Sequence, residues 1–278
     1  MTAASPSTST RPGAAEASGP AGASSPALAD QVVLVTGAGR GLGHAIARAF
    51  LAQGARVVVN YRSSRAAATE LADRHPGRAL PVQADVRDRA QVDALFAAAA
   101  EAFGAPVSTV VNNALVDFSF DGDARAKADT IGFEAFATQF GGAVQGALHT
   151  TQAALPGFER LGSGRVITIG TNLFQHPVVP YHDYTAAKAA LLSLTRTFAE
   201  DLGPRGVTVN MVSGGLLRTT DASSATPEPV FDAIAAGTPL RSVTTPEELA
   251  DAVLFFASPW ARAVTGQNLV VDGGLVKG

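Results

Sequence analysis

The chain has 278 residues, a formal net charge of −3 at pH 7 and 46% hydrophobic residues. It is long enough for one large α/β domain or two small ones, and its charge gives no electrostatic reason to expect a nucleic-acid partner. It has no cysteine, which excludes disulfides and thiolate catalysis and fits a reducing compartment such as the cytoplasm. The histidines show no metal-ligand spacing and the apolar runs are too short to span a membrane, so we expect neither a metal site nor a membrane anchor.

Residues 1–30 differ from the rest of the chain, because they are almost entirely Ala, Ser, Thr, Pro and Gly. Such a segment has too little apolar surface to offset the entropy of ordering it. It also lacks the basic start and the apolar core of a secretory signal. We predict a disordered tail without a role in catalysis, followed by one domain over residues 31–278.

Short β-branched runs then alternate with longer amphipathic runs to the end of the chain. The predicted strands are 32–35, 55–59, 79–84, 107–111, 165–169, 207–212 and 268–271. Strands that are apolar on both faces and separated by helical patterns indicate a parallel sheet covered on both sides. We therefore predict a single-domain, Rossmann-type α/β fold, a doubly wound parallel sheet of about seven strands with helices on both faces and ligands at the carboxyl ends of the strands.

The first predicted strand runs into the glycine-rich stretch "TGAGRGLGHA", which begins at Thr36. Gly37, Gly41 and Gly43 follow a strand and open a helix, where backbone N–H groups can reach a pyrophosphate. An ordinary glycine-rich turn is the alternative. The position at the start of a βαβ unit favours dinucleotide binding, although the spacing is not that of the commonest fingerprint.

The end of the second strand, "VVVNYRSS", predicts which dinucleotide binds. An acidic residue here would accept hydrogen bonds from the adenosine ribose and repel a 2′-phosphate. The chain has the neutral Asn60 instead, followed by Arg62, and Arg40 lies in the glycine-rich loop. Arginine binds phosphate bidentately, so we predict NADPH rather than NADH. Two merely solvated arginines are the alternative.

The stretch "PYHDYTAAKAAL" carries the catalytic candidates. Tyr184 and Lys188 are four residues apart, so they lie on one face of a predicted helix. An ammonium near a phenol lowers the pKa of the phenol, and such a tyrosine can protonate a carbonyl oxygen. Tyr181 has no such partner and is interpreted as a pocket wall, and Asp183 as a helix N-cap. A half-buried tyrosine beside a surface lysine is the alternative.

Several motifs in order resemble the short-chain dehydrogenase/reductase family, and within it the bacterial 3-oxoacyl-[acyl-carrier-protein] reductases. They are "TGAGRGLG", "ADV", "NNA", "YTAAK", "TPEELADAVLFFAS" and "TGQNLVVDGGL", spread over residues 31 to 276. The resemblance implies that Tyr184 and Lys188 are catalytic and that Lys188 also binds the nicotinamide ribose. Thr171 stands thirteen residues before Tyr184, where the family usually has a serine, and is interpreted as catalytic rather than as a mere strand end.

The resemblance also implies a set of residues that bind NADPH. They are Gly37, Gly39, Arg40, Gly41, Leu42, Gly43, Tyr61, Arg62, Ser63, Asp85, Val86, Asn113, Ala114, Tyr184, Lys188, Leu216 and Thr219.

Two further positions depart from the family pattern. Ala143 stands where an asparagine usually helps to hold a water that links the lysine to solvent. Either the proton relay is weaker here, or a bend at Gly141 and Gly142 exposes a backbone carbonyl for the same purpose. Leu115 replaces the usual glycine after "NNA" and should add bulk near the cofactor or the substrate entrance.

The expected function is that of an NADPH-dependent carbonyl reductase that converts a 3-oxoacyl thioester to the 3-hydroxyacyl form. Segment 216–239 is the predicted substrate lid. Its composition leaves the ketone open, so a polyketide, sugar, steroid or pterin ketone is an alternative, as is a dinucleotide-binding protein without turnover. By resemblance we expect a homotetramer. The acidic acyl carrier protein is a possible partner, met by Arg205 and Arg160 near the pocket mouth.

Overall fold

The structure is a computed structural model that describes residues 26–118, 120–121, 123–220, 223–224 and 226–277. Within these residues seven strands form one sheet in the order β3-β2-β1-β4-β5-β6-β7, and every neighbouring pair is parallel. The strands are β1 (Val32–Val35), β2 (Arg56–Tyr61), β3 (Ala79–Gln83), β4 (Thr109–Asn112), β5 (Gly164–Thr171), β6 (Val207–Gly214) and β7 (Asn268–Val271). The order reverses between β1 and β4, which is where such folds bind ligands.

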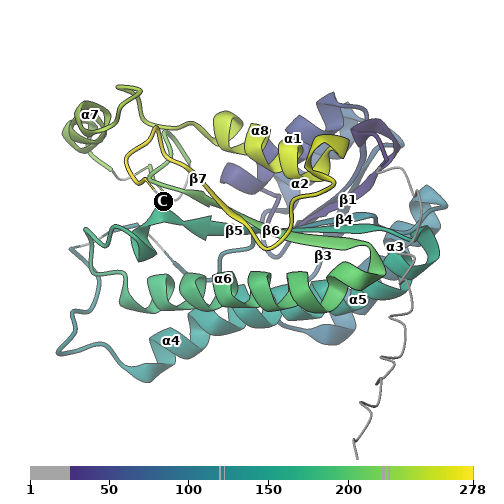
Figure 1. The fold of residues 1–278 in the computed structure, drawn as a ribbon, viewed down its shortest axis with the longest axis horizontal. Coiled ribbons are helices and arrows are strands. Elements are labelled where there is room, and N and C mark those ends of the chain that lie inside the picture. The colour runs from purple at the N-terminus through teal and green to yellow at the C-terminus, as the bar shows by residue number, and fades with distance from the viewer. Residues whose placement is uncertain (1–25, 119, 122, 221–222, 225, 278) are drawn as a thin grey trace, which may run out of the picture.

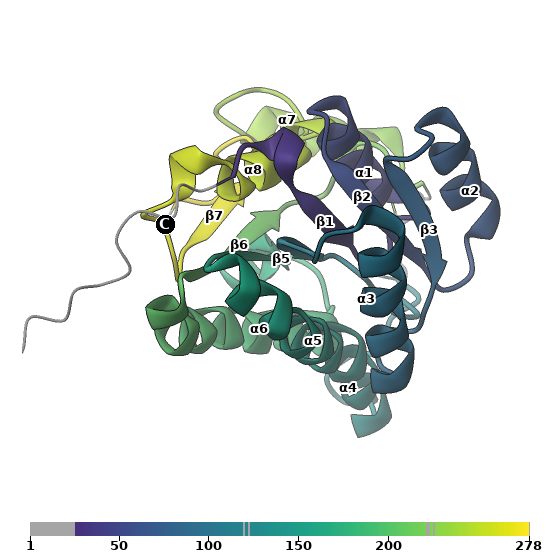
Figure 2. The ribbon, with the colours of Figure 1, turned by 90° about the vertical axis from the view of Figure 1, so that its right-hand side faces the viewer.

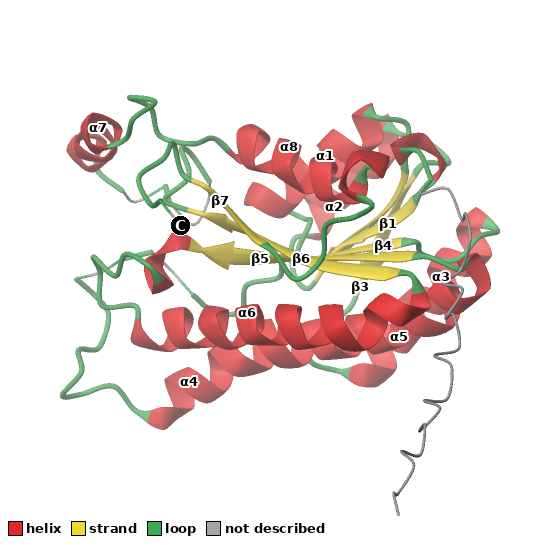
Figure 3. Cartoon of the chain, viewed as in Figure 1, coloured by secondary structure: helices red, strands yellow, loops and turns green. Residues whose placement is uncertain are grey.

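Helices cover both faces of this sheet (Figures 1 and 2). One face carries α1 (Gly41–Ala52), α2 (Arg65–Arg74) and α8 (Pro246–Ala257). The other carries α3 (Arg89–Phe103), α4 (Phe133–Phe140), α5 (Gly146–Leu161) and α6 (His182–Leu202). The remaining helix, α7 (Glu228–Gly237), lies on the side toward which the arrow of β5 points (Figure 3). The predicted parallel α/β sheet with helices on both faces is confirmed.

Local signals in the sequence begin and end several of these helices. The Asp88 carboxylate caps α3 by accepting from the backbone N–H groups of Ala90 and Gln91, and the helix ends at Gly104 with φ of 62°. Thr245 and Glu248 form a reciprocal capping box at the start of α8. These caps fix the residues at which the two helices begin and at which α3 ends.

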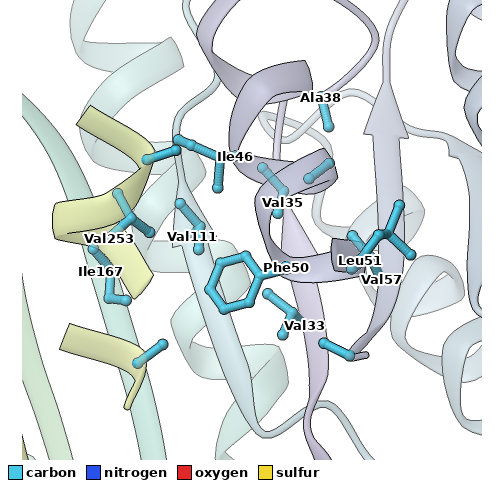
Figure 4. Close-up of a cluster of buried hydrophobic side chains, with 14 of the residues drawn as sticks. Val33, Val35, Ala38, Ile46, Phe50, Leu51, Val57, Val111, Ile167 and Val253 are labelled. Atoms are coloured by element: carbon cyan, nitrogen blue, oxygen red, sulfur yellow. The ribbon is translucent and has the colours of Figure 1, made fainter. Parts of the chain in front are cut away.

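The largest cluster of buried hydrophobic side chains packs α1 and α8 against the face of the sheet that also carries α2. Phe50 of α1 is fully buried among side chains of β1, β4 and β5, such as Val33, Val111 and Ile167, with Val253 of α8 beside them (Figure 4). Burial of a phenylalanine of this size stabilises a fold by about 1.5–3 kcal/mol relative to exposure. The cluster therefore fixes the position of α1, the helix that begins at the glycine-rich loop.

Residues 26–30, at the end of the predicted tail, contact the rest of the domain. Residues 1–25 of that tail lie outside the described residues. Leu28–Asp30 form a 3₁₀ turn, and Leu28 packs against the core. The Gln31 side chain donates to the carbonyl of Pro26 at 3.1 Å and to that of Ala257 at 2.9 Å. Apolar contact and amide hydrogen bonds therefore hold residues 26–30 against the domain.

In the described part of the chain, every helix is too short or too polar to cross a membrane. The same residues contain no cluster of three or more His, Asp or Glu side chains suited to a metal ion.

Candidate active site

The glycine-rich loop is built around contacts that leave no room for side chains. A Cβ on Gly43 would lie 2.4 Å from the carbonyl oxygen of Gly37, and Gly37 itself has φ of 64°. The Thr36 hydroxyl accepts from the N–H groups of Asn113 at 2.9 Å and Ala114 at 3.0 Å. These bonds join the end of β1 to the end of β4, so the predicted cofactor residues of the two strands lie together.

Asn60 supports this loop from beneath. Its side-chain oxygen accepts from the N–H of Gly37 at 3.2 Å, and its amide group donates to the carbonyl of Ala84 at 3.0 Å. Asn60 is buried. A Cβ on Gly39 would lie 2.7 Å from the Cβ of Ser64, so the backbone of the loop passes close to the end of β2. The residue that replaces the expected carboxylate thus holds the loop.

The two predicted phosphate ligands lie at the surface. Arg40 immediately precedes α1 and is exposed. Arg62 is half exposed and donates from Nη2 to Oδ1 of Asp117 at 2.7 Å. After the end of β3, the Arg87 guanidinium pairs with Asp85 at 2.6 Å and holds the pKa of this carboxyl below its usual range. Two of the predicted cofactor residues, Arg62 and Asp85, therefore already have charged partners on this chain.

Tyr184 and Lys188 lie on the buried face of α6, and Thr171 ends β5 beneath them. The Lys188 ammonium donates to the carbonyl of Ile169 at 2.6 Å. Tyr184 is 6% exposed, and the Nζ atom of Lys188 lies 5.8 Å from the centre of its ring. The three predicted catalytic residues are therefore adjacent, on two neighbouring elements.

The pKa shifts of Tyr184 and Lys188 differ from the expectation. Burial raises the pKa of Tyr184 to about 12, and the hydrogen bond from Thr171 only partly opposes this. Burial also lowers the pKa of Lys188 to about 8. The prediction that Lys188 lowers the pKa of Tyr184 toward neutrality is wrong for this geometry, because desolvation of both groups is the larger effect.

Asp183 is not the N-cap of α6. The helix begins at His182, with Tyr181 in the cap position and no capping by its side chain. The Asp183 carboxylate lies in the first turn, is almost fully buried and pairs with Arg125 from the segment after β4. A buried carboxylate requires such a cation, which explains why the cap prediction failed.

An aromatic cluster covers Tyr184. Phe118 stacks on its ring with centroids 4.7 Å apart, and Phe120 meets it edge-on at 5.6 Å. Both rings also contact Tyr181, at 5.2 and 5.8 Å. The Arg125 guanidinium lies 4.4 Å above the Phe118 ring. We call Phe118 and Phe120 the aromatic cover, because they lie over the phenol that the site needs.

The departure at Ala143 coincides with a local change of helix geometry. Residues Gly141–Gln145 form a π-helical turn between α4 and α5, at the bend that the glycines predict. A cavity of about 10 Å³ lies here, lined by Ala143, Lys188 and Asn112 among others. Asn112 accepts from the Thr150 hydroxyl at 2.7 Å, and its buried side-chain nitrogen has no hydrogen-bond partner among the described residues. The cavity has the volume of one water molecule.

The other predicted site residues take less distinctive positions. Val86 is buried and lines the same cavity, whereas Leu42, Leu115 and Leu216 are partly buried and Ser63 and Thr219 are exposed. The predicted lid at 216–239 contains α7, and its residues 221–222 and 225 lie outside the described residues.

Sequence reasoning missed the residues between β4 and α4 that meet the site. They are Asp117, Phe118, Phe120 and Arg125. The signal was the stretch "VDFSFDGDAR" directly after "NNAL", in which two aromatic residues two positions apart are flanked by charges. Asn112, the first residue of "NNA", was missed for a different reason, since nothing in the sequence shows which side-chain atom is left unpaired.

Comparison with known proteins identifies the kind of chain. The family model described as Enoyl-(Acyl carrier protein) reductase matches residues 37–276. A 3-oxoacyl-[acyl-carrier-protein] reductase of Synechocystis sp. is 35% identical over 90% of this chain and 98% of its own length. An L-rhamnose 1-dehydrogenase (NAD(P)(+)) of Azotobacter vinelandii is 37% identical over 89% of this chain and 97% of its own.

A solved structure agrees in fold over nearly the whole domain. A 7α-hydroxysteroid dehydrogenase, complexed with NADH and 7-oxo glycochenodeoxycholic acid, superposes with a TM-score of 0.80 at 30% identity. The superposition covers 89% of this chain and 95% of that one. The names of these similar proteins specify different substrates.

Proposed function

Because the chain belongs to the short-chain dehydrogenase/reductase family, we propose that it is an NADPH-dependent carbonyl reductase that acts through Tyr184, Lys188 and Thr171. The observation that carries this proposal is the convergence of these three side chains at the end of β5 and on the adjoining face of α6. The Tyr184 phenol and the Thr171 hydroxyl form a pair of donors for one oxygen atom, and the buried Lys188 ammonium lies beside the Tyr184 ring.

The residues of the loop fit a dinucleotide. Gly43 and Gly39 are positions where a Cβ would collide with backbone or side-chain atoms, so the loop is compact enough to present N–H groups to a pyrophosphate. Gly37, Gly41 and the N-terminus of α1 would hold the phosphates. When bound, the nicotinamide supplies the hydride that reduces the carbonyl carbon.

The chain's own residues supply the proton and the binding of the oxygen. Tyr184 donates its phenolic proton to the carbonyl oxygen as negative charge develops there, and the Thr171 hydroxyl donates to the same atom. A pKa of about 12 keeps Tyr184 protonated at neutral pH, which suits a proton donor. Lys188, held by the carbonyl of Ile169, would supply a positive charge that stabilises the oxyanion and would hold the nicotinamide ribose.

NADPH is preferred to NADH in this proposal. The end of β2 carries the neutral Asn60 instead of a carboxylate. Arg62 follows two residues later, and its guanidinium is half exposed. The similar proteins do not decide the matter, because one is named for NAD(P)(+) and another is complexed with NADH. The support for NADPH is therefore the charge at this strand end.

The proposed substrate is a 3-oxoacyl thioester, which the similarity to the Synechocystis protein supports. One observation favours a cyclic ketone as a second candidate. An open cavity of about 620 Å³ lies beside Tyr181 and is lined mostly by apolar residues such as Phe174 and Val179. A largely apolar cavity of this size suits a ring system, and the structurally similar 7α-hydroxysteroid dehydrogenase is complexed with a 7-oxo glycochenodeoxycholic acid.

For an acyl carrier protein as partner, the structure corrects the predicted contact. Arg160 lies in the last turn of α5 and Arg205 follows α6, shortly before β5 and β6 begin, whereas Thr171 lies at the carboxyl end of β5 and Tyr184 in the first turn of α6. The two arginines therefore lie at the opposite end of the sheet from the site, and Arg205 pairs there with the Glu159 carboxylate. Equal kcat/KM for carrier-bound and coenzyme-A-bound acetoacetyl groups would refute the carrier as a partner.

The proposed assembly is a homotetramer. Large apolar side chains are exposed beside α4 and α6, with Phe133 at 77% and Val178 at 64%. Burial of such residues between copies of the chain would stabilise an oligomer. Light scattering at micromolar concentration should give the mass of four chains, with a dimer as the next state. A monomer would contradict the proposal.

The function itself is tested by NADPH oxidation with a panel of ketones. The panel contains acetoacetyl-coenzyme A, an acetoacetyl carrier protein and a steroid ketone, each measured with NADPH and with NADH. Turnover of the thioesters supports the proposal, and turnover of the steroid alone favours the second candidate. If NADPH binds but no ketone is reduced, the chain is a dinucleotide-binding protein without turnover.

A further inference from the structure

The ion pair between Arg62 and Asp117 joins two strand ends across the predicted cofactor groove. Arg62 follows β2, and Asp117 lies five residues beyond the end of β4. Their side chains meet at 2.7 Å while remaining 44% and 57% exposed. The Arg62 guanidinium holds the pKa of the Asp117 carboxyl below its usual range, so Asp117 is ionised at neutral pH. The Asp117 carboxylate is thus paired with the guanidinium that the 2′-phosphate of NADPH would need.

A 2′-phosphate and the Asp117 carboxylate are competitors for this cation. Both are anions with oxygen acceptors that suit a guanidinium, and the phosphate carries the larger charge. The exposed pair that must be broken is weak, because water screens both partners. A 2′-hydroxyl has no charge with which to displace a carboxylate. Only a cofactor with the phosphate is therefore expected to release Asp117.

Release of Asp117 acts directly on the cover of Tyr184. Asp117 has φ of 46°, in the left-handed region, and the next residue is Phe118, which stacks on Tyr184. The far end of the same segment is held more firmly, since Arg125 and Asp183 form an ion pair with side chains 19% and 3% exposed. The Asp117 end is thus the weaker of two attachments, and the one that can open.

We propose that Asp117 is a positioning residue that couples recognition of the 2′-phosphate at Arg62 to uncovering of Tyr184. In the free chain the Asp117–Arg62 pair adds to the contacts of the Phe118 ring with Arg125 and Tyr181, and together they keep Phe118 stacked on the Tyr184 ring. A bound 2′-phosphate takes Arg62, repels Asp117 and withdraws the aromatic cover, which gives the ketone access to the phenol. The inference rests on the proposed preference for NADPH and on the placement of Tyr184 as proton donor.

Two adenosine fragments separate the phosphate effect from that of the nicotinamide, which would itself lie near Tyr184. Adenosine 2′,5′-bisphosphate carries the 2′-phosphate, and adenosine 5′-monophosphate does not. In Asp117→Asn, calorimetry should show about twofold to fivefold tighter binding of the bisphosphate, because an exposed ion pair no longer competes for Arg62. Binding of the monophosphate should not change. Asp123→Asn, which removes an exposed carboxylate of the same segment, should behave as the original chain.

Hydroxyl-radical footprinting then measures the exposure of Tyr184 and Phe118 directly. In the original chain the bisphosphate should raise oxidation of Tyr184 at least twofold, and the monophosphate should leave it unchanged. In Asp117→Asn, oxidation should be high without any ligand and insensitive to the bisphosphate, since Arg62 is free in both states. Asp123→Asn should keep the original response, and circular dichroism checks that each variant is folded.

The outcomes distinguish the two proposals. If the bisphosphate binds more tightly than the monophosphate but Tyr184 stays equally protected, the coupling is overturned and the NADPH preference stands. Equal exposure of Tyr184 in Asp117→Asn and in the original chain overturns it as well. If the two fragments bind equally, the NADPH preference fails and phosphate recognition by Arg62 fails with it.

Discussion

The two sides of the candidate active site are built in different ways. One side consists of the glycine-rich loop and the paired ends of β5 and α6, where side chains such as Tyr184 and Lys188 are fully packed. The other consists of residues 113–132 between β4 and α4, attached through Arg62–Asp117, Arg125–Asp183 and the aromatic cover. The first side is fixed by the sheet and the second by a few side-chain contacts.

This difference assigns different tasks to the two sides. Groups that transfer a proton must be held within a fraction of an ångström, which regular elements achieve. Groups that admit cofactor and substrate must give way, and weak contacts allow this. Substitutions on the first side should therefore affect chemistry or folding strongly, whereas those on the second should change affinity and access.

The largest effect is expected for Tyr184→Phe. It removes the proposed proton donor and preserves the ring that stacks on Phe118, so turnover should fall by about two to four orders of magnitude while NADPH still binds. Tyr181→Phe is the control, because Tyr181 contacts the same aromatic cover and has no role in proton transfer. Steady-state rates with NADPH and a ketone compare the two. Equal losses would place the chemistry elsewhere.

Phe50→Ala tests whether the core fixes the first side. Phe50 is fully buried between α1 and the sheet, so its removal leaves a cavity and should lower the free energy of unfolding by about 3–5 kcal/mol. Urea unfolding at matched protein concentration measures this. Trp260→Ala, at a side chain that is 81% exposed, should cost far less. Similar losses in both variants would mean that the core around Phe50 does not determine stability.

Arg62→Ala tests the second side. Loss of a charge-assisted bond to phosphate costs about 1.5–3 kcal/mol, so KM for NADPH should rise by about one to two orders of magnitude. KM for NADH should barely change. Arg74→Ala removes a charge from the far end of α2, where its side chain is 71% exposed, and should affect neither cofactor. The cofactor assignment fails if Arg62→Ala weakens NADPH and NADH alike.

The sequence predicted the first side well and the second poorly, for a physical reason. Strands and the glycine-rich loop follow from hydrophobic periodicity and from close backbone approach, which are local properties, so the spacing of Tyr184 and Lys188 sufficed to place them on one face. The attachments of the second side join residues far apart in sequence, such as Arg125 with Asp183. The desolvation that raises the pKa of Tyr184 is likewise a property of the packed fold.

The smallest expected effect is on the free energy of unfolding, which the burial of the charged Lys188 lowers. Burial lowers its pKa from 10.5 to about 8, so below pH 8 the folded chain carries a charge that burial disfavours, at a cost of about 3 kcal/mol. Between these two pKa values the unfolded chain binds more protons, so this cost disappears and stability rises with pH. Tyr184 acts in the opposite direction from pH 10 upward, because its pKa is raised to about 12 and only the unfolded chain then loses the proton.

Lys188→Met removes the ammonium and keeps most of the apolar stem. At pH 7 the variant should be more stable by about 1–3 kcal/mol, since the lost hydrogen bond to the Ile169 carbonyl offsets part of the gain. At pH 10 the advantage should have nearly vanished, while turnover is impaired throughout. Urea midpoints at the two pH values, at equal protein concentration, measure the difference. A variant that is less stable at pH 7 would show that the bond to Ile169 outweighs the burial of the charge, and that Lys188 stabilises this side of the site.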